Sequence, residues 1–226
     1  MKLDAVAGVP AALVGESNRR GVVVLLHGLG GSKSVQLAEA EQLAADGFVA
    51  VVLDAVGHGD RRYPDFEQRF SSGRGERSYF EAVAAGAREL PAVVTELRRR
   101  LGLPVGACGI SMGGATLFGA MAQGVALEAA VTIVASPRWR VVGESPHDRP
   151  ERFGETPLLM MTAGQDTVVP SEAAHAFHRV LSDRFRPGHL ILRHFPEEGH
   201  MFTPAAWAQA TGAMVEWFER FLAPTH

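Results

Sequence analysis

One serine of this chain lies in a sequence pattern that suits nucleophilic attack. The stretch Gly109-Ile110-Ser111-Met112-Gly113 matches G-x-S-x-G, follows a short strand pattern and opens a helical one. A serine on such a sharp strand-to-helix turn has a strained backbone, and only small neighbours leave it room. The turn would direct the Ser111 hydroxyl away from the sheet. Taken alone, the pattern fits a nucleophile about as well as a glycine-rich start of a helix.

A serine hydroxyl needs a base, and the base needs a group that orients it. Asp166 in AGQDTVVP and His200 in EEGHMF each follow an apolar strand pattern directly. Alone, Asp166 could be a turn residue that caps a local N–H, and His200 could be a polar loop residue. Together with Ser111 they occur in the chain order Ser, Asp, His that this type of turn requires. The order predicts a catalytic triad in which His200 is the base and Asp166 orients it.

The oxyanion that forms on an attacked carbonyl needs two backbone N–H donors. We expect one from Met112, directly after the serine, and the other from Leu29 in the glycine-rich stretch LLHGLGGSK. Such a stretch could instead hold a phosphate, but neither G-x-G-x-x-G nor G-x-x-x-x-G-K-[ST] is present. The stretch is therefore predicted to form an oxyanion hole.

A substrate pocket is expected where residues follow strand ends or flank the predicted triad. The residues that meet this criterion are Leu29, Met112, Trp139, Val168 and Met201. For Trp139 and Met201, packing in the core is an equally good interpretation. The short segment 137–156 suggests a shallow site with little cap, which favours short acyl chains.

Strand and helix patterns alternate along the chain and would position these residues. Apolar runs predict buried strands at 21–28, 48–54, 104–110, 128–136, 157–166 and 189–195. Helical patterns occupy 32–46, 78–101, 112–124, 171–184 and 204–222, and Pro91 should kink or divide the second of them. Residues 3–6 and 11–15 suggest an antiparallel hairpin on the edge. The alternation predicts an α/β fold with a mostly parallel central sheet and helices on both faces.

Two segments, 55–77 and 137–156, show no regular pattern and are long for a compact domain. Ligands bind beyond the carboxyl ends of the strands in open α/β sheets, and we expect both segments to lie there. Either segment could supply a mobile lid. Five arginines cluster in the first segment (Arg61, Arg62, Arg69, Arg74 and Arg77), but acidic residues alternate with them and indicate a solvated loop.

The composition narrows the class of protein. The chain has 226 residues, 46% of them hydrophobic and 21% charged, which is typical of one globular domain spanning 1–226. The net charge of −3 argues against nucleic acid as a partner. The single cysteine, Cys108, allows neither an intramolecular disulfide nor a cysteine zinc site. No apolar run is long enough for a bilayer or a secretory signal, so we expect a soluble, cytoplasmic protein without membrane partners.

Five motifs together carry a resemblance to a known family. HGLGG at 27–31, DAVGHGD at 54–60, GISMGG, GQDTVVP and EEGHMF occur in this order. The chain thereby resembles the α/β-hydrolase superfamily over residues 3–222. Within it the chain looks like the small esterases with little or no cap that are related to dienelactone hydrolase and to prolyl-oligopeptidase-type catalytic domains. Dienelactone hydrolases proper have a cysteine nucleophile, and Ser111 departs from that pattern.

The resemblance implies an activity and roles for the motif residues. It assigns Ser111 as nucleophile, His200 as base and Asp166 as acid, and it makes His27 and His58 structural residues around the site. The expected function is hydrolysis of small carboxylic esters through an acyl-enzyme, with no cofactor or metal. A thioesterase or a small peptidase would use the same triad. A non-catalytic ligand-binding relative is the alternative from another class, although such proteins commonly lose a triad residue.

Overall fold

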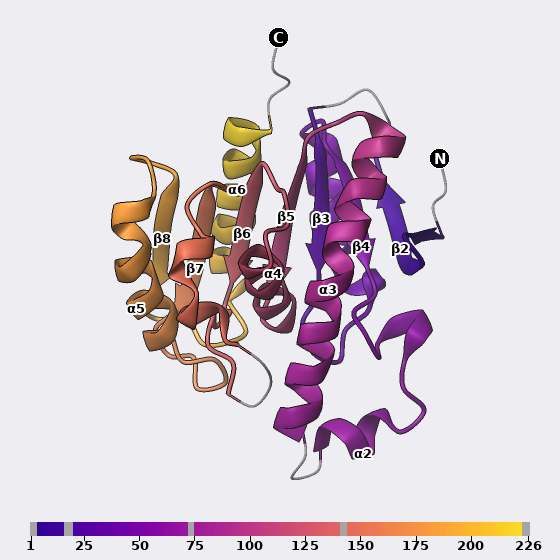
Figure 1. The fold of residues 1–226 in the computed structure, drawn as a ribbon, viewed down its shortest axis with the longest axis horizontal. Coiled ribbons are helices and arrows are strands. Elements are labelled where there is room, and N and C mark those ends of the chain that lie inside the picture. Colours follow the sequence, from indigo (N-terminus) through magenta and orange to yellow (C-terminus); the bar gives the residue numbers. More distant parts are fainter. Residues whose placement is uncertain (1–3, 16–19, 72–74, 141–143, 223–226) are drawn as a thin grey trace.

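The computed structural model describes residues 4–15, 20–71, 75–140 and 144–222, which form an eight-stranded sheet with helices on both faces (Figure 1). The strands lie in the order β1-β2-β4-β3-β5-β6-β7-β8. Strands β3 to β8 run parallel, whereas β1 and β2 form an antiparallel hairpin beside β4. The strands are β1 (Ala5–Val6), β2 (Val9–Val14), β3 (Val22–Leu26), β4 (Val49–Leu53), β5 (Val105–Ile110), β6 (Ala129–Ile133), β7 (Leu158–Ala163) and β8 (Leu190–Phe195).

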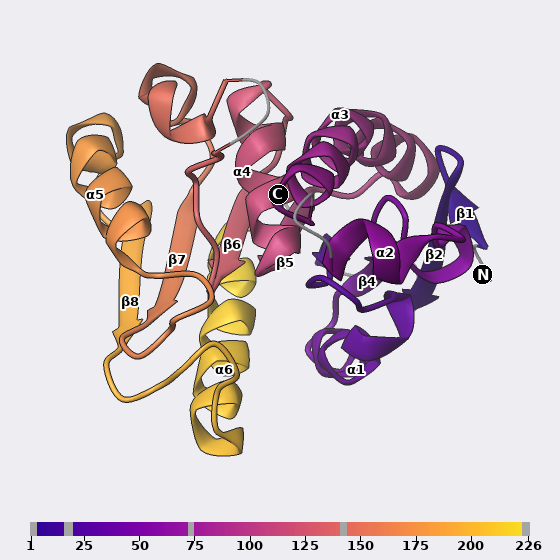
Figure 2. The same cartoon turned by 90° about the horizontal axis from the view of Figure 1, so that it is seen from below.

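Helices α1 and α6 cover one face of the sheet, and α3, α4 and α5 cover the other (Figure 2). The helices are α1 (Leu37–Ala45), α2 (Phe66–Ser71), α3 (Gly75–Leu101), α4 (Met112–Ala122), α5 (Glu172–Leu181) and α6 (Pro204–Phe221). Short 3-10 turns are η1 (Lys33–Gln36), η2 (Gly59–Arg61), η3 (Pro146–Asp148), η4 (Pro150–Arg152) and η5 (Ser182–Arg184). Within the described ranges, no helix is both long and apolar enough to cross a bilayer.

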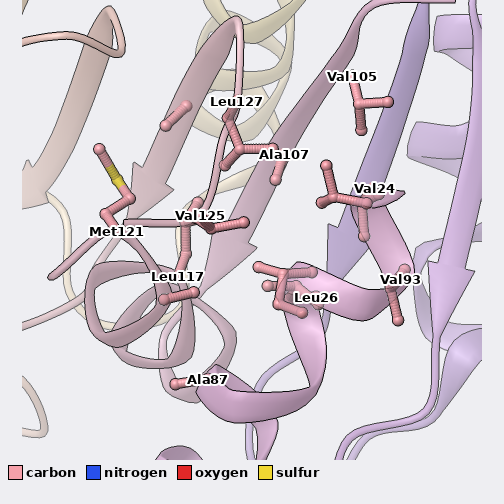
Figure 3. Packing of buried hydrophobic residues seen from close by; sticks show 14 of the residues in the cluster. Val24, Leu26, Ala87, Val93, Val105, Ala107, Leu117, Met121, Val125 and Leu127 are labelled. Carbon is pink, nitrogen blue, oxygen red and sulfur yellow. The ribbon is translucent and has the colours of Figure 1, made fainter. Parts of the chain in front are cut away.

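The continuous apolar run of β3 is explained by burial on both of its faces. Val22, Val24 and Leu26 belong to the core between the sheet and α3, α4 and α5, where Figure 3 shows Val24 and Leu26 among side chains of α3 and α4. Val23 and Leu25 point to the opposite core, beneath α1 and α6. Burying an aliphatic side chain of this size stabilises the fold by about 1.5–3 kcal/mol. The two cores together hold the central strands in register.

The carboxyl ends of the parallel strands lie at one edge of the sheet, at the bottom of Figure 1. The turns after β3, β5, β7 and β8 all leave the sheet at this edge, which Figure 2 views from below. These turns contain the HGLGG stretch, the serine motif, Asp166 and His200. The sheet therefore gathers segments that lie far apart in the sequence.

Of the two outcomes expected at Pro91, a kink or a division of the helix, the structure excludes the division. Instead of two helices, residues 75–101 form the single helix α3 with Pro91 inside it. Proline removes one backbone hydrogen bond of a helix, which costs about 3 kcal/mol relative to alanine. Ala87, Leu90, Val93 and Val94 surround this position and are all buried. Their packing against the sheet keeps the helix continuous.

The two segments predicted to be irregular contain short helices. Segment 55–77 holds η2 and α2, and α3 begins within it at Gly75; segment 137–156 holds η3 and η4. Aromatic contacts stabilise α2, because the Phe66 ring lies 4.8 Å from the His58 ring and 4.5 Å from the Phe70 ring. Arg74 in the first segment, residues 141–143 in the second and Leu3 of the predicted hairpin lie outside the described residues.

Candidate active site

Ser111 occupies a strained turn between β5 and α4. Its φ is 53° and its ψ is −113°, in a region that residues with a side chain rarely adopt. The Ser111 N–H donates to the Ile133 carbonyl of β6 at 2.9 Å, which fixes the turn to the sheet. A Cβ at Gly113 would overlap the Leu26 carbonyl, and one at Gly109 would overlap the Gly113 carbonyl. The two glycines therefore allow α4 to start directly against β3.

The structure brings Ser111, His200 and Asp166 into one hydrogen-bonded chain. His200 Nε2 lies 3.0 Å from Ser111 Oγ, and His200 Nδ1 lies 2.7 Å from Asp166 Oδ2. When the Nδ1–H donates to the carboxylate, Nε2 is left as an acceptor for the serine hydroxyl. This is the arrangement that a general base for serine requires.

Asp166 satisfies both interpretations that its sequence context allowed. Its Oδ1 accepts hydrogen bonds from the N–H groups of Val168 at 2.8 Å and Val169 at 2.7 Å, as a turn residue does. Its Oδ2 faces His200, and the residue is only 7% exposed. Because the local turn fixes one oxygen, the other is held ready for the histidine. One oxygen of Asp166 therefore caps the local turn, and the other is the acceptor that orients His200.

Met112 and Leu29, the predicted donors to an oxyanion, follow the carboxyl ends of β5 and β3. Met112 is the first residue of α4, so its N–H has no acceptor within the helix. Leu29 lies in the turn after β3, where the Gly31 N–H donates to the Gly28 carbonyl at 3.2 Å. This turn packs against the nucleophile, since a Cβ on Gly28 would come within 3.5 Å of Ser111 Cβ. The close approach depends on the absence of a side chain at Gly28.

His27 and His58 support the turns around the site. His27 Nδ1 donates to the Gly28 carbonyl at 2.7 Å, and its Nε2 accepts from the Ala55 N–H at 3.0 Å. His27 thus connects the turn after β3 to the segment after β4. Burial lowers the pKa of both histidines below the ordinary value. Burial thus favours the neutral form of both, which suits the structural roles that the resemblance implies.

A buried carboxylate that the sequence analysis did not select lies beside these turns. Asp54 follows β4, is 0% exposed, and accepts hydrogen bonds from the N–H groups of Lys33 at 2.7 Å and Asp60 at 2.9 Å. The Lys33 ammonium reaches it at 2.9 Å. Burial alone would raise the pKa of Asp54, but these donors lower it below the ordinary value. Its position directly after a buried strand, like that of Asp166, is the signal that could have identified it.

A cavity of about 1530 Å³ opens above Ser111 and His200. Of the predicted substrate-binding residues, Leu29, Val168 and Met201 line it. Val168 is 67% and Met201 86% exposed, so both side chains are free to meet a ligand. Phe70, at the end of α2, also borders the cavity, which places part of segment 55–77 at the site.

Trp139 does not line this cavity, and its predicted place in the substrate pocket is corrected here. Its ring packs against Gly119 of α4, where a Cβ would overlap the indole, and it lies 6.3 Å from the Phe80 ring. The position of Trp139 therefore agrees with the other interpretation of this residue, packing in the core. The Met112 side chain is likewise buried, against Val83 and Ala115, and reaches the site only through its backbone.

A metal site is not evident in the described part of the chain. Among those residues, no group of three or more His, Cys, Asp or Glu side chains is arranged to hold a metal ion. Cys108 is buried in β5, and burial raises the pKa of its thiol far above the ordinary value.

Comparison with known proteins finds likenesses over nearly the whole chain. A family model described as serine aminopeptidase, S33, matches residues 17–152, which include Ser111 but neither Asp166 nor His200. The Bacillus subtilis (strain 168) protein named "Putative esterase YitV" is 23% identical, and the match covers 96% of this chain and 97% of that protein.

Two solved structures share the fold. TT1662 from Thermus thermophilus is 25% identical with a TM-score of 0.85, and the match covers 100% of this chain and 98% of that one. A dienelactone hydrolase from Anabaena variabilis ATCC 29413 is 21% identical with a TM-score of 0.68, covering 94% of this chain and 92% of its own. At this identity, the second likeness concerns the fold alone.

Proposed function

The chain belongs to the serine aminopeptidase S33 family of the α/β-hydrolase superfamily and is a hydrolase, and from this we propose that it cleaves carboxylic esters through an acyl-enzyme on Ser111. The observation that carries the proposal is the hydrogen-bonded chain from Ser111 through His200 to Asp166. The esterase name of the Bacillus subtilis relative supports an ester as the substrate.

In the proposed acylation step, Ser111 Oγ attacks the ester carbonyl carbon while His200 Nε2 takes the hydroxyl proton. The carbonyl electron pair moves onto oxygen, and the N–H groups of Met112 and Leu29 stabilise the resulting anion. Asp166 stabilises the imidazolium through Nδ1–H. The tetrahedral intermediate then expels the alcohol, which takes its proton from His200.

Deacylation repeats the same steps with water as the nucleophile. His200 takes a proton from the water as its oxygen attacks the acyl carbon, and the collapse of the second intermediate returns a proton to Ser111 Oγ. The carboxylic acid leaves, and the enzyme regains its starting state.

The family match makes a peptidase the second candidate, since its description names an aminopeptidase. Thioesters would need the same attack with a different leaving group. A matched panel of one acyl group as ester, thioester and amide separates these activities by kcat/KM. The preference for short acyl chains stays a prediction, and a series of esters of increasing chain length in the same panel tests it.

A fluorophosphonate probe tests the nucleophile directly. We expect the wild-type protein to be labelled and the Ser111→Ala variant to remain unlabelled and to lose about a thousandfold or more in kcat. Ser182→Ala is the matched control, because Ser182 Oγ donates to the Arg179 carbonyl at the end of α5. An unlabelled wild-type protein would favour a ligand-binding protein instead. Ester hydrolysis at the wild-type rate in Ser111→Ala would show that Ser111 is not the nucleophile.

A further inference from the structure

The oxyanion turn is partly exposed, and the hydrogen bonds from His27 and Gly31 to the Gly28 carbonyl act on its first residue. It begins at Gly28, where β3 ends, passes through the half-exposed Leu29 and the left-handed Gly30 (φ 78°), and ends at Lys33. A donor N–H has to lie within a few tenths of an ångström of its place to stabilise a transition state. The backbone therefore needs a second fixed point beyond Leu29.

Asp54 supplies that point with both carboxylate oxygens. Oδ1 accepts the Lys33 backbone N–H at 2.7 Å, and Oδ2 accepts the Lys33 ammonium at 2.9 Å. The ammonium also pairs with Asp60, whose own N–H donates to Asp54 Oδ2 at 2.9 Å. One carboxylate thus holds both the backbone and the side chain of the last residue of the turn.

Asp54 is itself fixed on several sides. Its N–H donates to the Pro10 carbonyl at 3.0 Å, and Arg61 Nη2 donates to its carbonyl at 2.8 Å. Arg61 in turn forms an ion pair with Glu89 of α3 at 2.8 Å. A Cβ on Gly59, whose φ is 54°, would overlap the Asp54 carboxylate. The carboxylate is therefore enclosed by backbone, and the hold on Lys33 is rigid.

We propose that Lys33 and Asp54 are positioning residues for the oxyanion hole, which hold the turn so that the Leu29 N–H points at the substrate oxygen. This inference rests on the proposed function, since it needs an oxyanion to form. It concerns the transition state, because neither side chain lines the cavity above Ser111. The loss of either group should lower kcat and leave KM nearly unchanged.

A trifluoromethyl ketone inhibitor provides a readout that a merely structural role would not change. Ser111 Oγ adds to the ketone carbon, its proton passes to His200, and the carbonyl electron pair becomes an oxyanion in the hole. The matched secondary alcohol binds the same cavity without forming an oxyanion. In Lys33→Met and Asp54→Asn we expect inhibition by the ketone to weaken about ten- to hundredfold, with the alcohol affinity at the wild-type value. Lys33→Arg should restore much of the ketone affinity.

Glu128→Gln is the matched control. Glu128 also takes a backbone N–H, that of Val105 at 2.7 Å, and a cation, Arg98 at 2.7 Å, but it lies before β6 at the opposite edge of the sheet. The Glu128→Gln variant should be less stable than the wild type and should bind the ketone with the wild-type affinity. The inference is overturned if Lys33→Met and Asp54→Asn behave like Glu128→Gln. If Asp54→Asn fails to fold, the result for Lys33→Met alone tests the inference. A wild-type protein that neither hydrolyses esters nor binds the ketone refutes both the inference and the proposed function.

Discussion

At Gly113 the nucleophile turn has no room for a side chain. A Cβ there would overlap the backbone of Leu26, so Gly113→Ala has to push α4 away from β3. We expect a loss of about 1–3 kcal/mol in the free energy of unfolding, as for other overpacked sites. The displaced Ser111 should also lower kcat about a hundredfold. Urea denaturation and ester kinetics measure the two effects.

Gly212→Ala is the control for this substitution. Gly212 lies inside α6, and an added Cβ would meet nothing within 4 Å. Alanine favours a helix over glycine by about 1 kcal/mol, so this variant should be more stable and equally active. Equal stability changes in the two variants would show that the turn tolerates a side chain.

Sequence patterns were informative at this scale where a motif has a required chain order. The serine turn and the order of Ser111, Asp166 and His200 predicted which residues meet. The strand-end criterion failed for Trp139, because it places a residue at the sheet edge without fixing the direction of its side chain. It would have found Asp54, but the partner Lys33 is 21 residues away and only the fold joins them.

Among the elements, the turns after β3 and β4 depend on the ionised state of Asp54. Although burial raises its pKa, the donors Asp60 and Lys33 bring it below the ordinary value of 3.8. The unfolded chain therefore binds this proton more readily than the folded one. The stabilisation is present above the unfolded pKa and is lost as the pH falls through the lower folded pKa.

Asp54→Asn removes this dependence. We expect the variant to be less stable by about 2–3 kcal/mol at neutral pH, the value of hydrogen bonds to a charged group. Its unfolding temperature should then fall less steeply than that of the wild type between about pH 5 and about pH 2.5. Calorimetry over this range measures both curves, with the exposed Asp183→Asn as a control that retains the wild-type slope. Parallel curves for Asp54→Asn and the wild type would contradict the prediction.

The elements that sequence patterns missed are those held by contacts rather than by periodicity. Helix α2 has six residues, too few to show a repeat, and its aromatic stack on His58 is visible only in three dimensions. At Pro91 a division of the helix was one of two expected outcomes, and packing of α3 on the sheet overrides it. Long amphipathic elements with a buried face were predicted well, because their periodicity and their packing agree.

At the scale of the whole molecule, burial of the sheet on both faces was predictable because the strands read as continuous apolar runs, and the α/β-hydrolase fold is confirmed. The prediction of one domain requires more than a shared sheet. The cores on its two faces have to unfold together. If they do, a substitution in either core shifts one common transition, whatever probe follows it.

Substitutions of Val93 in α3 and Val215 in α6 test whether the two cores unfold together, since these residues are buried on opposite faces of the sheet. Val→Ala at each should cost about 1.5–2.5 kcal/mol, and the costs should add within about 0.5 kcal/mol because the side chains share no contacts. Phe118 and Phe177, whose rings lie 6.1 Å apart in one core, form the coupled control, and their Leu variants should deviate from additivity by more than that. Urea curves followed by circular dichroism and by tryptophan fluorescence should coincide for every variant. Two separate transitions, each moved by only one of the valines, would mean that the faces of the sheet fold as distinct units.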